Sequence, residues 1–297
     1  MFESLSSPNI HTPQNLAEYA NTITHYPQSS LWAFGSSIMD SENFYPNLNA
    51  NVEIIYLGLI DELYKFQRND RAVEFGSMVN LNEMLTSGKS ILPQILIDTL
   101  KSIGSYSIRN RISLGGAIAN KKFTSALIGT FFILDTQIEL RYLKKKRLHN
   151  HFFPISKLVE KNGELILPET SLISRIRISI NSYNYKYFVT IDDPCLATSN
   201  SVTIAFICNL EQISTTNARL AITYPNKGFF SSRDTDMLIN NLQLPIEPSA
   251  QTEIINKILN QIGAEFVLNP IQLDRTTKLL SSLMNNLNYT IFTTTHE

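Results

Sequence analysis

Two adjacent glycines, Gly115 and Gly116, are the feature that most constrains how this chain can fold. The sequence holds only 11 glycines in 297 residues, and this pair lies in an apolar segment that is typical of strands. Glycine is needed where the backbone takes a positive φ or where another group approaches it closely. The pair therefore predicts either a tight turn or bulge between two strands, or a concave set of N–H groups that binds an anion.

Composition favours a soluble globular protein that is more readily two domains than one. Hydrophobic residues make up 43% of the chain, yet no apolar run approaches the roughly 18 residues that span a bilayer. The first residues lack the pattern of a signal peptide, so a cytoplasmic location is expected. A formal charge of −1 gives no general attraction to nucleic acid or to anionic membranes.

No metal or catalytic motif is found in the sequence. The two cysteines, Cys195 and Cys208, exclude a four-thiolate iron–sulfur site within this chain and a disulfide framework. His149 and His151 follow a basic run and indicate a solvated hairpin, with a metal site as the alternative. The GxGxxG, P-loop and GxSxG patterns are all absent. We therefore expect no catalytic side chain and no metal in this chain.

Periodicity predicts an α+β chain in two parts. In the first part, Thr12 and Pro13 start a helix, and Asn80 or Asn82 caps another. In the second part, alternating apolar positions predict antiparallel strands with one solvated face, followed by helices. The predicted strands are 31–34, 52–57, 72–76, 138–142, 152–153 and 172–178, then 183–189, 202–208 and 220–222; the predicted helices are 91–103, 127–134, 233–242, 252–262 and 273–287.

The order of these elements resembles the FAD-binding subunit of molybdenum hydroxylases, of the xanthine dehydrogenase and carbon monoxide dehydrogenase type. In that family two glycine-containing turns hold the flavin dinucleotide. Residues 33–37 stand in the place of the first turn, and residues 113–120, after Ile108-Arg109-Asn110, match the second. Residues 75–81 are similar to a strand and turn between the two.

The resemblance implies a two-subdomain PCMH-type FAD-binding domain over residues 1–180, with subdomains at about 1–62 and 63–180. A smaller α+β domain, similar to the C-terminal domain of the carbon monoxide dehydrogenase flavoprotein, follows over 181–297. Ile103 and Ile173 are expected to wall the flavin ring, or else to be core residues. Lys186 is expected near the ring, or else is a solvated strand lysine. The implied FAD-binding residues are Ala33, Phe34, Gly35, Ser36, Ser37, Ile38, Ile103, Leu114, Gly115, Gly116, Ala117, Ile173 and Lys186.

The chain departs from the family pattern at several positions. Ala117 stands where an asparagine is usual, and Phe123 and Ala126 stand where a proline and an acidic residue are common. Each lost hydrogen bond to a charged ligand costs about 1.5–3 kcal/mol. These departures motivate an alternative in which the chain no longer binds FAD.

The resemblance implies an electron-transfer subunit. A partner with the molybdenum cofactor and a [2Fe–2S] partner would deliver electrons to FAD, which passes them to NAD or another acceptor. One alternative is a structural subunit, or a degenerate descendant of the family, without FAD. Another is a different FAD-linked reductase with a similar two-turn topology.

Overall fold

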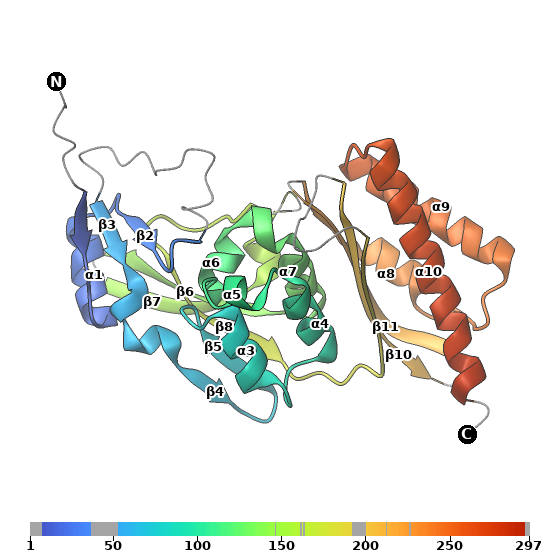
Figure 1. The fold of residues 1–297 in the computed structure, drawn as a ribbon, viewed down its shortest axis with the longest axis horizontal. Coiled ribbons are helices and arrows are strands. Elements are labelled where there is room, and N and C mark those ends of the chain that lie inside the picture. The colour runs from blue at the N-terminus through green and yellow to red at the C-terminus, as the bar shows by residue number, and fades with distance from the viewer. Residues whose placement is uncertain are drawn as a thin grey trace.

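Three β-sheets follow one another along the long axis of the molecule, each covered by helices (Figure 1). The N-terminal sheet lies at one end, and the C-terminal helices lie at the other. The computed structural model describes residues 8–36, 53–145, 147–160, 162, 164–191, 200–211, 213–225 and 227–294.

The N-terminal sheet is parallel, with strand order β1-β3-β2. Its elements are β1 (Asn9–His11), α1 (Leu16–His25), β2 (Ser30–Trp32) and β3 (Glu53–Tyr56), followed by the short turns η1 (Leu57–Leu59) and η2 (Asp61–Tyr64).

The prediction that Thr12 and Pro13 start the first helix is wrong. Helix α1 begins at Leu16, because the side chain of Asn15 accepts a hydrogen bond from the N–H of Glu18 at 2.9 Å. This interaction satisfies one of the N–H groups that a helix start leaves without a partner. Tyr19 then faces the core of this layer.

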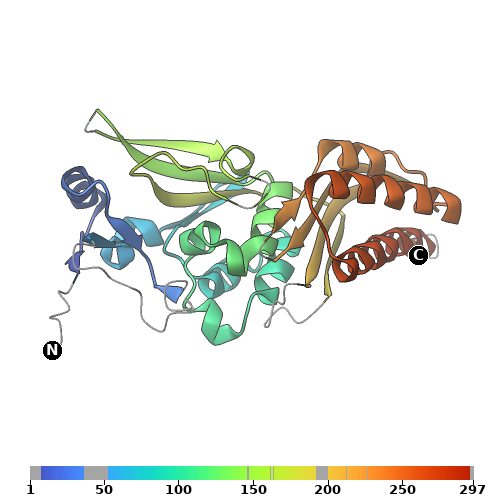
Figure 2. The same ribbon diagram turned by 90° about the horizontal axis from the view of Figure 1, so that it is seen from above.

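The central sheet is antiparallel, with strand order β4-β5-β8-β6-β7. Helices cover one of its faces, as the view from above shows (Figure 2). Asn80, one of the two residues predicted as the cap, begins the first of these helices and forms a capping box with Glu83. The strands are β4 (Phe66–Arg68), β5 (Ala72–Gly76), β6 (Gln137–Lys144), β7 (Arg147–Pro154) and β8 (Leu172–Ser179); the helices are α3 (Leu81–Gly88), α4 (Gln94–Ser102), α5 (Tyr106–Arg109), α6 (Leu114–Ala119), α7 (Lys121–Ile133) and the turn η3 (Ile155–Lys157).

The C-terminal sheet is antiparallel, with strand order β12-β11-β10-β9, and three helices follow it in the chain. Its elements are β9 (Tyr185–Ile191), β10 (Val202–Glu211), β11 (Ser214–Tyr224), β12 (Gly228–Phe230), α8 (Arg233–Ile239), α9 (Pro248–Glu265) and α10 (Pro270–Thr294).

The prediction that this sheet has one solvated face is wrong, because helices cover both faces. On β10, Ile204 and Phe206 pack into the cluster formed with α8, α9 and α10. Their neighbours Ala205 and Ile207 belong instead to the central cluster, on the side of α4 and α7. A Cβ on Gly129 of α7 would lie 2.7 Å from Thr223 Cγ2, so this glycine lets α7 contact β11 closely.

We propose two domains, residues 1–180, with subdomains at about 1–62 and 63–180, and residues 181–297. The three sheets take their strands from 9–56, 66–179 and 185–230, respectively, which supports these limits. Among the helices of the described ranges, none is long and apolar enough to cross a membrane.

Candidate functional site

A cavity of about 240 Å³ lies where the N-terminal layer meets the central sheet and helix α6. Its wall is made of small and aliphatic side chains, and three serines are its polar side chains. The lining residues are Leu31, Ala33, Leu57, Ser77, Met78, Ser113, Gly115, Gly116, Ala119, Leu167, Ser171, Leu172 and Ile173.

The Gly-Gly pair lies in the first turn of α6, so the prediction of a turn or bulge between two strands is wrong. Ser113 is the N-cap of this helix, and its Oγ accepts a hydrogen bond from the N–H of Gly116 at 3.2 Å. The N–H of Leu114 donates to the carbonyl of Val79, and that of Gly115 to the carbonyl of Ser77, both at 2.8 Å. These bonds attach the start of α6 to residues 77–79.

The two positions hold glycine for different structural reasons. A Cβ on Gly115 would lie 2.8 Å from Ser77 Cβ and 3.2 Å from the Ser77 carbonyl oxygen, so Gly115 is needed for packing inside the protein. A Cβ on Gly116 would meet only Ser113 Oγ, at 2.7 Å, and would otherwise project into open space. Neither glycine has a positive φ. Gly116 therefore forms an open part of the cavity wall.

The N–H groups of this pair already have acceptors within the protein. Gly115 donates to a backbone carbonyl, which is fixed in place. Gly116 donates to the Ser113 hydroxyl, which rotates about a single bond. Of the two, only the N–H of Gly116 is therefore available to a ligand without a backbone movement.

The first predicted turn, residues 33–37, contributes one residue to the cavity. Ala33 lines it, whereas Phe34 packs against the N-terminal cluster. Gly35 has a φ of 73°, a conformation that favours glycine, and Ser36 is exposed. Ser37 and Ile38 lie outside the described residues.

The other predicted residues separate into two groups. Ile173 lines the cavity, and its place beside the flavin ring stays a prediction. Ile103, Leu114 and Ala117 are buried in the central cluster and do not line it. Lys186 lies on β9, where its ammonium pairs with the carboxylate of Asp98 on α4. A role for Lys186 beside the flavin ring stays a prediction.

Sequence reasoning did not include Ser77, Met78 and Ser113 among the binding residues, although it quoted the segments that contain them. The signal for both serines is a small polar residue close to glycine in those segments. The cavity residues from Leu167 to Leu172 have no neighbouring glycine or other sequence pattern that marks them.

Arg109 also has a role that the sequence did not reveal. Its Nη1 donates to the carbonyl oxygens of Lys101, Ile103 and Gly104, at 3.3, 3.1 and 2.7 Å. These carbonyls lie at the C-terminal end of α4, where backbone acceptors have no helical partner. Arg109 therefore fixes the segment between α4 and α6.

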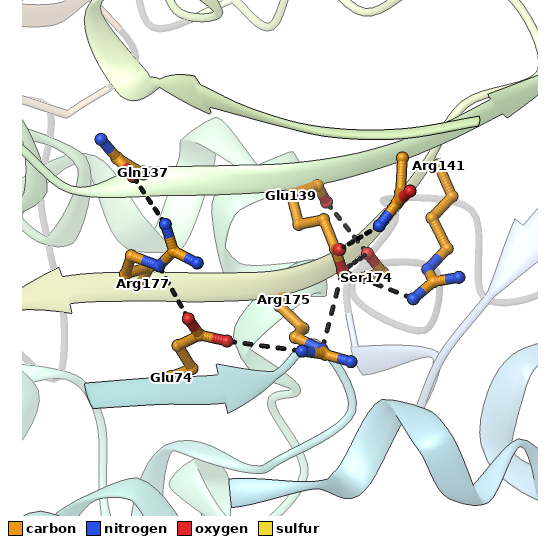
Figure 3. A network of polar contacts seen from close by, with 8 residues as sticks. Glu74, Gln137, Glu139, Arg141, Ser174, Arg175 and Arg177 are labelled. Carbon is orange, nitrogen blue, oxygen red and sulfur yellow. Dashed lines mark hydrogen bonds and ion pairs between the residues drawn. The ribbon is translucent and has the colours of Figure 1, made fainter. Parts of the chain in front are cut away.

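A second polar cluster lies on the central sheet, and Figure 3 shows its ion pairs. The Glu74 carboxylate contacts Arg177 Nε at 2.7 Å and Arg175 Nη1 at 3.4 Å. The Glu139 carboxylate contacts Arg175 Nε at 3.6 Å and Arg141 Nη2 at 3.7 Å. The carboxylates on β5 and β6 are thus each paired with two arginines, in a cluster of three arginines and two carboxylates.

Glu139 is the most buried charged group in this cluster. Its oxygens accept hydrogen bonds from Ser174 Oγ at 2.6 Å and Asn150 Nδ2 at 3.0 Å. Burial raises the pKa of Glu139, but these hydrogen bonds and the charges of Arg141 and Arg175 outweigh burial and hold the pKa below its ordinary value. A stably ionised, fully paired carboxylate is suited to structure rather than to proton transfer, and it does not line the cavity.

Solved structures with this fold cover nearly the whole chain. Quinoline 2-oxidoreductase from Pseudomonas putida 86 matches with a TM-score of 0.76 and 15% identity, over 97% of this chain and 98% of that one. Carbon monoxide dehydrogenase from Hydrogenophaga pseudoflava matches with a TM-score of 0.73 and 15% identity, over 95% and 97%. Carbon monoxide dehydrogenase from Oligotropha carboxidovorans matches with a TM-score of 0.71 and 15% identity, over 94% and 96%. The TM-scores show that these proteins share the fold of this chain, although only 15% of the aligned residues are identical.

The sequence of this chain matches a family model but no individual curated protein. No curated protein matches the sequence of this chain. A family model described as the FAD binding domain in molybdopterin dehydrogenase matches residues 3–179, which is more than half of the chain. The chain therefore belongs to this family, as the FAD-binding component of a molybdenum hydroxylase-type oxidoreductase, and FAD is its cofactor.

Proposed function

We propose that this chain is the electron-transfer subunit of a multi-subunit molybdenum hydroxylase of the xanthine dehydrogenase type. It would receive electrons from [2Fe–2S] clusters on a partner subunit, which in turn is reduced by a subunit with the molybdenum cofactor. NAD or another acceptor would then be reduced. Solved structures with this fold include a quinoline oxidoreductase and carbon monoxide dehydrogenases, and their coverage of the chain supports this assignment.

The observation that carries the proposal is the open wall at Gly116. A Cβ there would project into the cavity and meet only a serine hydroxyl, so the absence of a side chain keeps space for a ligand. The cavity of about 240 Å³ is smaller than the roughly 300–1,000 Å³ of pockets that enclose a drug-sized ligand. It therefore fits one part of FAD, and we assign it to the diphosphate and the groups next to it.

The residues present fit this cofactor. Gly116 can donate its N–H once the Ser113 side chain turns about its Cα–Cβ bond, and the Ser113 hydroxyl can donate its own proton as a second donor. Ala33 and Ile173 supply apolar surface on the other walls. Bound FAD supplies the redox chemistry, accepting electrons and passing them on. The chain itself binds and orients the cofactor and needs no acid, base or nucleophile.

The test is the flavin content of the purified full-length protein. We expect a yellow protein that releases FAD on denaturation and takes it up again after removal. A colourless protein that also rejects added FAD would support the structural subunit without FAD and contradict the proposal. Purification from the native host tests the partners, because a chain isolated without molybdenum and iron–sulfur subunits would favour a different FAD-linked reductase.

A further inference from the structure

The hydroxyl of Ser77 has no hydrogen-bond partner although the residue is buried. Ser77 is 3% exposed and lines the cavity. Its Oγ is one of five buried side-chain polar atoms without a partner in the described part of the chain; the others belong to Tyr19, Arg109, Thr136 and Arg141. None of those four residues lines the cavity. A buried polar group without a partner is unfavourable and is rare in folded proteins, so this one needs an explanation.

The backbone of Ser77 is fixed on both sides. Its N–H donates to the carbonyl of Ser174 at 3.0 Å, and its carbonyl accepts from the N–H of Gly115 at 2.8 Å. Its Cβ lies where only a glycine at position 115 leaves room. The Cβ of Ser77 is therefore held beside the glycine wall, and the hydroxyl can turn about the Cα–Cβ and Cβ–Oγ bonds.

The hydroxyl oxygens of the other two serines of the cavity wall already have hydrogen-bond partners in the protein. Ser113 Oγ accepts from the N–H of Gly116, and Ser171 Oγ donates to the carbonyl of Pro168 at 2.6 Å. Ser77 and Ser113 flank the Gly-Gly pair, one against Gly115 and the other against Gly116. This corner of the cavity thus gathers hydrogen-bond donors without a charged side chain, which suits a ligand made of acceptor oxygens.

We propose that the Ser77 hydroxyl donates a hydrogen bond to a phosphate oxygen of bound FAD. This inference rests on the proposed function, because it takes FAD as the occupant of the cavity. A hydroxyl that donates to an ionised oxygen forms one of the stronger hydrogen bonds in proteins. Loss of the hydroxyl should therefore weaken FAD binding by about 10-fold to 100-fold, which corresponds to about 1.4–2.8 kcal/mol.

The experiment compares full-length wild type with Ser77→Ala and with Thr136→Val after FAD has been removed. Thr136 is the matched control because its buried Oγ1 also lacks a partner but lies away from the cavity. The dissociation constant for FAD is measured from the quenching of flavin fluorescence. The thermal midpoint of the FAD-free proteins and the phosphorus NMR spectrum of FAD at saturation are measured beside it.

We expect Ser77→Ala to raise the dissociation constant, to shift a phosphorus resonance and to leave the midpoint of the FAD-free protein unchanged or higher. Thr136→Val should leave the dissociation constant unchanged. Equal affinity in Ser77→Ala and wild type, or unchanged phosphorus resonances, would overturn this inference alone. A lower midpoint in FAD-free Ser77→Ala would also overturn it, since the hydroxyl would then have a partner in the protein. A wild type that binds no FAD would instead overturn the proposed function.

Discussion

Replacement of Gly116 by valine tests directly whether the cavity at α6 holds the flavin cofactor. The new Cβ would lie 2.7 Å from Ser113 Oγ and would otherwise extend into the cavity. Because the neighbour in contact is a rotatable hydroxyl rather than backbone, the protein can absorb the change. We therefore expect Gly116→Val to fold and to lose FAD.

Gly116→Val should change the free energy of unfolding and the affinity for FAD by different amounts. Displacing the Ser113 hydroxyl removes an N-cap interaction worth about 0.5–2 kcal/mol. Replacing a helical glycine restores part of the roughly 1 kcal/mol that glycine costs a helix. The free energy of unfolding should thus fall by about 1.5 kcal/mol or less. The branched valine side chain would occupy space that the ligand needs. We expect it to cost the free energy of FAD binding at least the roughly 1–3 kcal/mol typical of overpacking, which weakens binding by about 5-fold to 150-fold.

The assay is the ratio of visible flavin absorbance to protein absorbance after purification, with thermal unfolding measured beside it. Gly263→Val is the matched control, because Gly263 is an exposed glycine of α9 with open space around its Cβ position. It should retain the flavin content of wild type. Wild-type flavin content in folded Gly116→Val would refute the cavity assignment. An unfolded Gly116→Val would refute the distinction between the two glycines.

Three further changes test other parts of the structure. Lys186→Ala should leave FAD bound but lower the reduction potential of the flavin, since a nearby cation stabilises the negative charge of the reduced form; an unchanged potential in a spectroelectrochemical titration would remove Lys186 from the site. Arg109→Ala removes the donor to three carbonyls at the end of α4 and should lower the free energy of unfolding by about 1.5–3 kcal/mol, measured in urea; an unchanged unfolding midpoint would contradict this role. Burial raises the pKa of Asp236 to about 6, so its favourable contribution to stability is present below its ordinary value of 3.8 and is lost as the pH rises through about 6. Asp236→Asn keeps an acceptor for the N–H of Leu220 and should gain stability over wild type between about pH 4 and pH 7; a gain that does not grow with pH would show that Asp236 is not the titrating group.

Local signals in the sequence were enough for most elements of the fold. The Asn80 cap with Glu83 three residues later is a local pattern, and helix α3 follows it as predicted. Strand β5 and the long helices α9 and α10 also have clear periodicity. In each case the side chains that decide the structure are neighbours in the sequence.

The turn or bulge between strands, one of the two predictions for the Gly-Gly segment, is wrong because the conformation of this segment depends on distant contacts. Two glycines lower helix propensity, and the apolar residues around them suggest a strand. The Ser113 cap and the hydrogen bonds to residues 77–79 override that preference. The covered faces of the C-terminal sheet have the same origin, since α4 and α7, which cover one of them, come about 60 to 110 residues earlier in the chain.

The cavity joins five separate parts of the chain, at residues 31–33, 57, 77–78, 113–119 and 167–173, and periodicity alone gives no reason to bring them together. Resemblance to a family predicted Ala33, Gly115, Gly116 and Ile173 as FAD-binding residues, and these four line the cavity. The serines of the cavity wall could not be predicted from the sequence, because their importance depends on which hydroxyls already have hydrogen-bond partners in the protein.

The structure also changes what Ala117, where the family usually has asparagine, implies for FAD binding. From the sequence, an alanine in place of asparagine counts as a lost contact to the cofactor. Ala117 is 1% exposed, belongs to the central cluster and does not line the cavity, whereas Gly116 beside it does. Ala126 on α7 does not line the cavity either. The residues that motivated the alternative without FAD are therefore absent from the wall where the phosphate would bind, and the open face of Gly116 favours a cavity that still holds its cofactor.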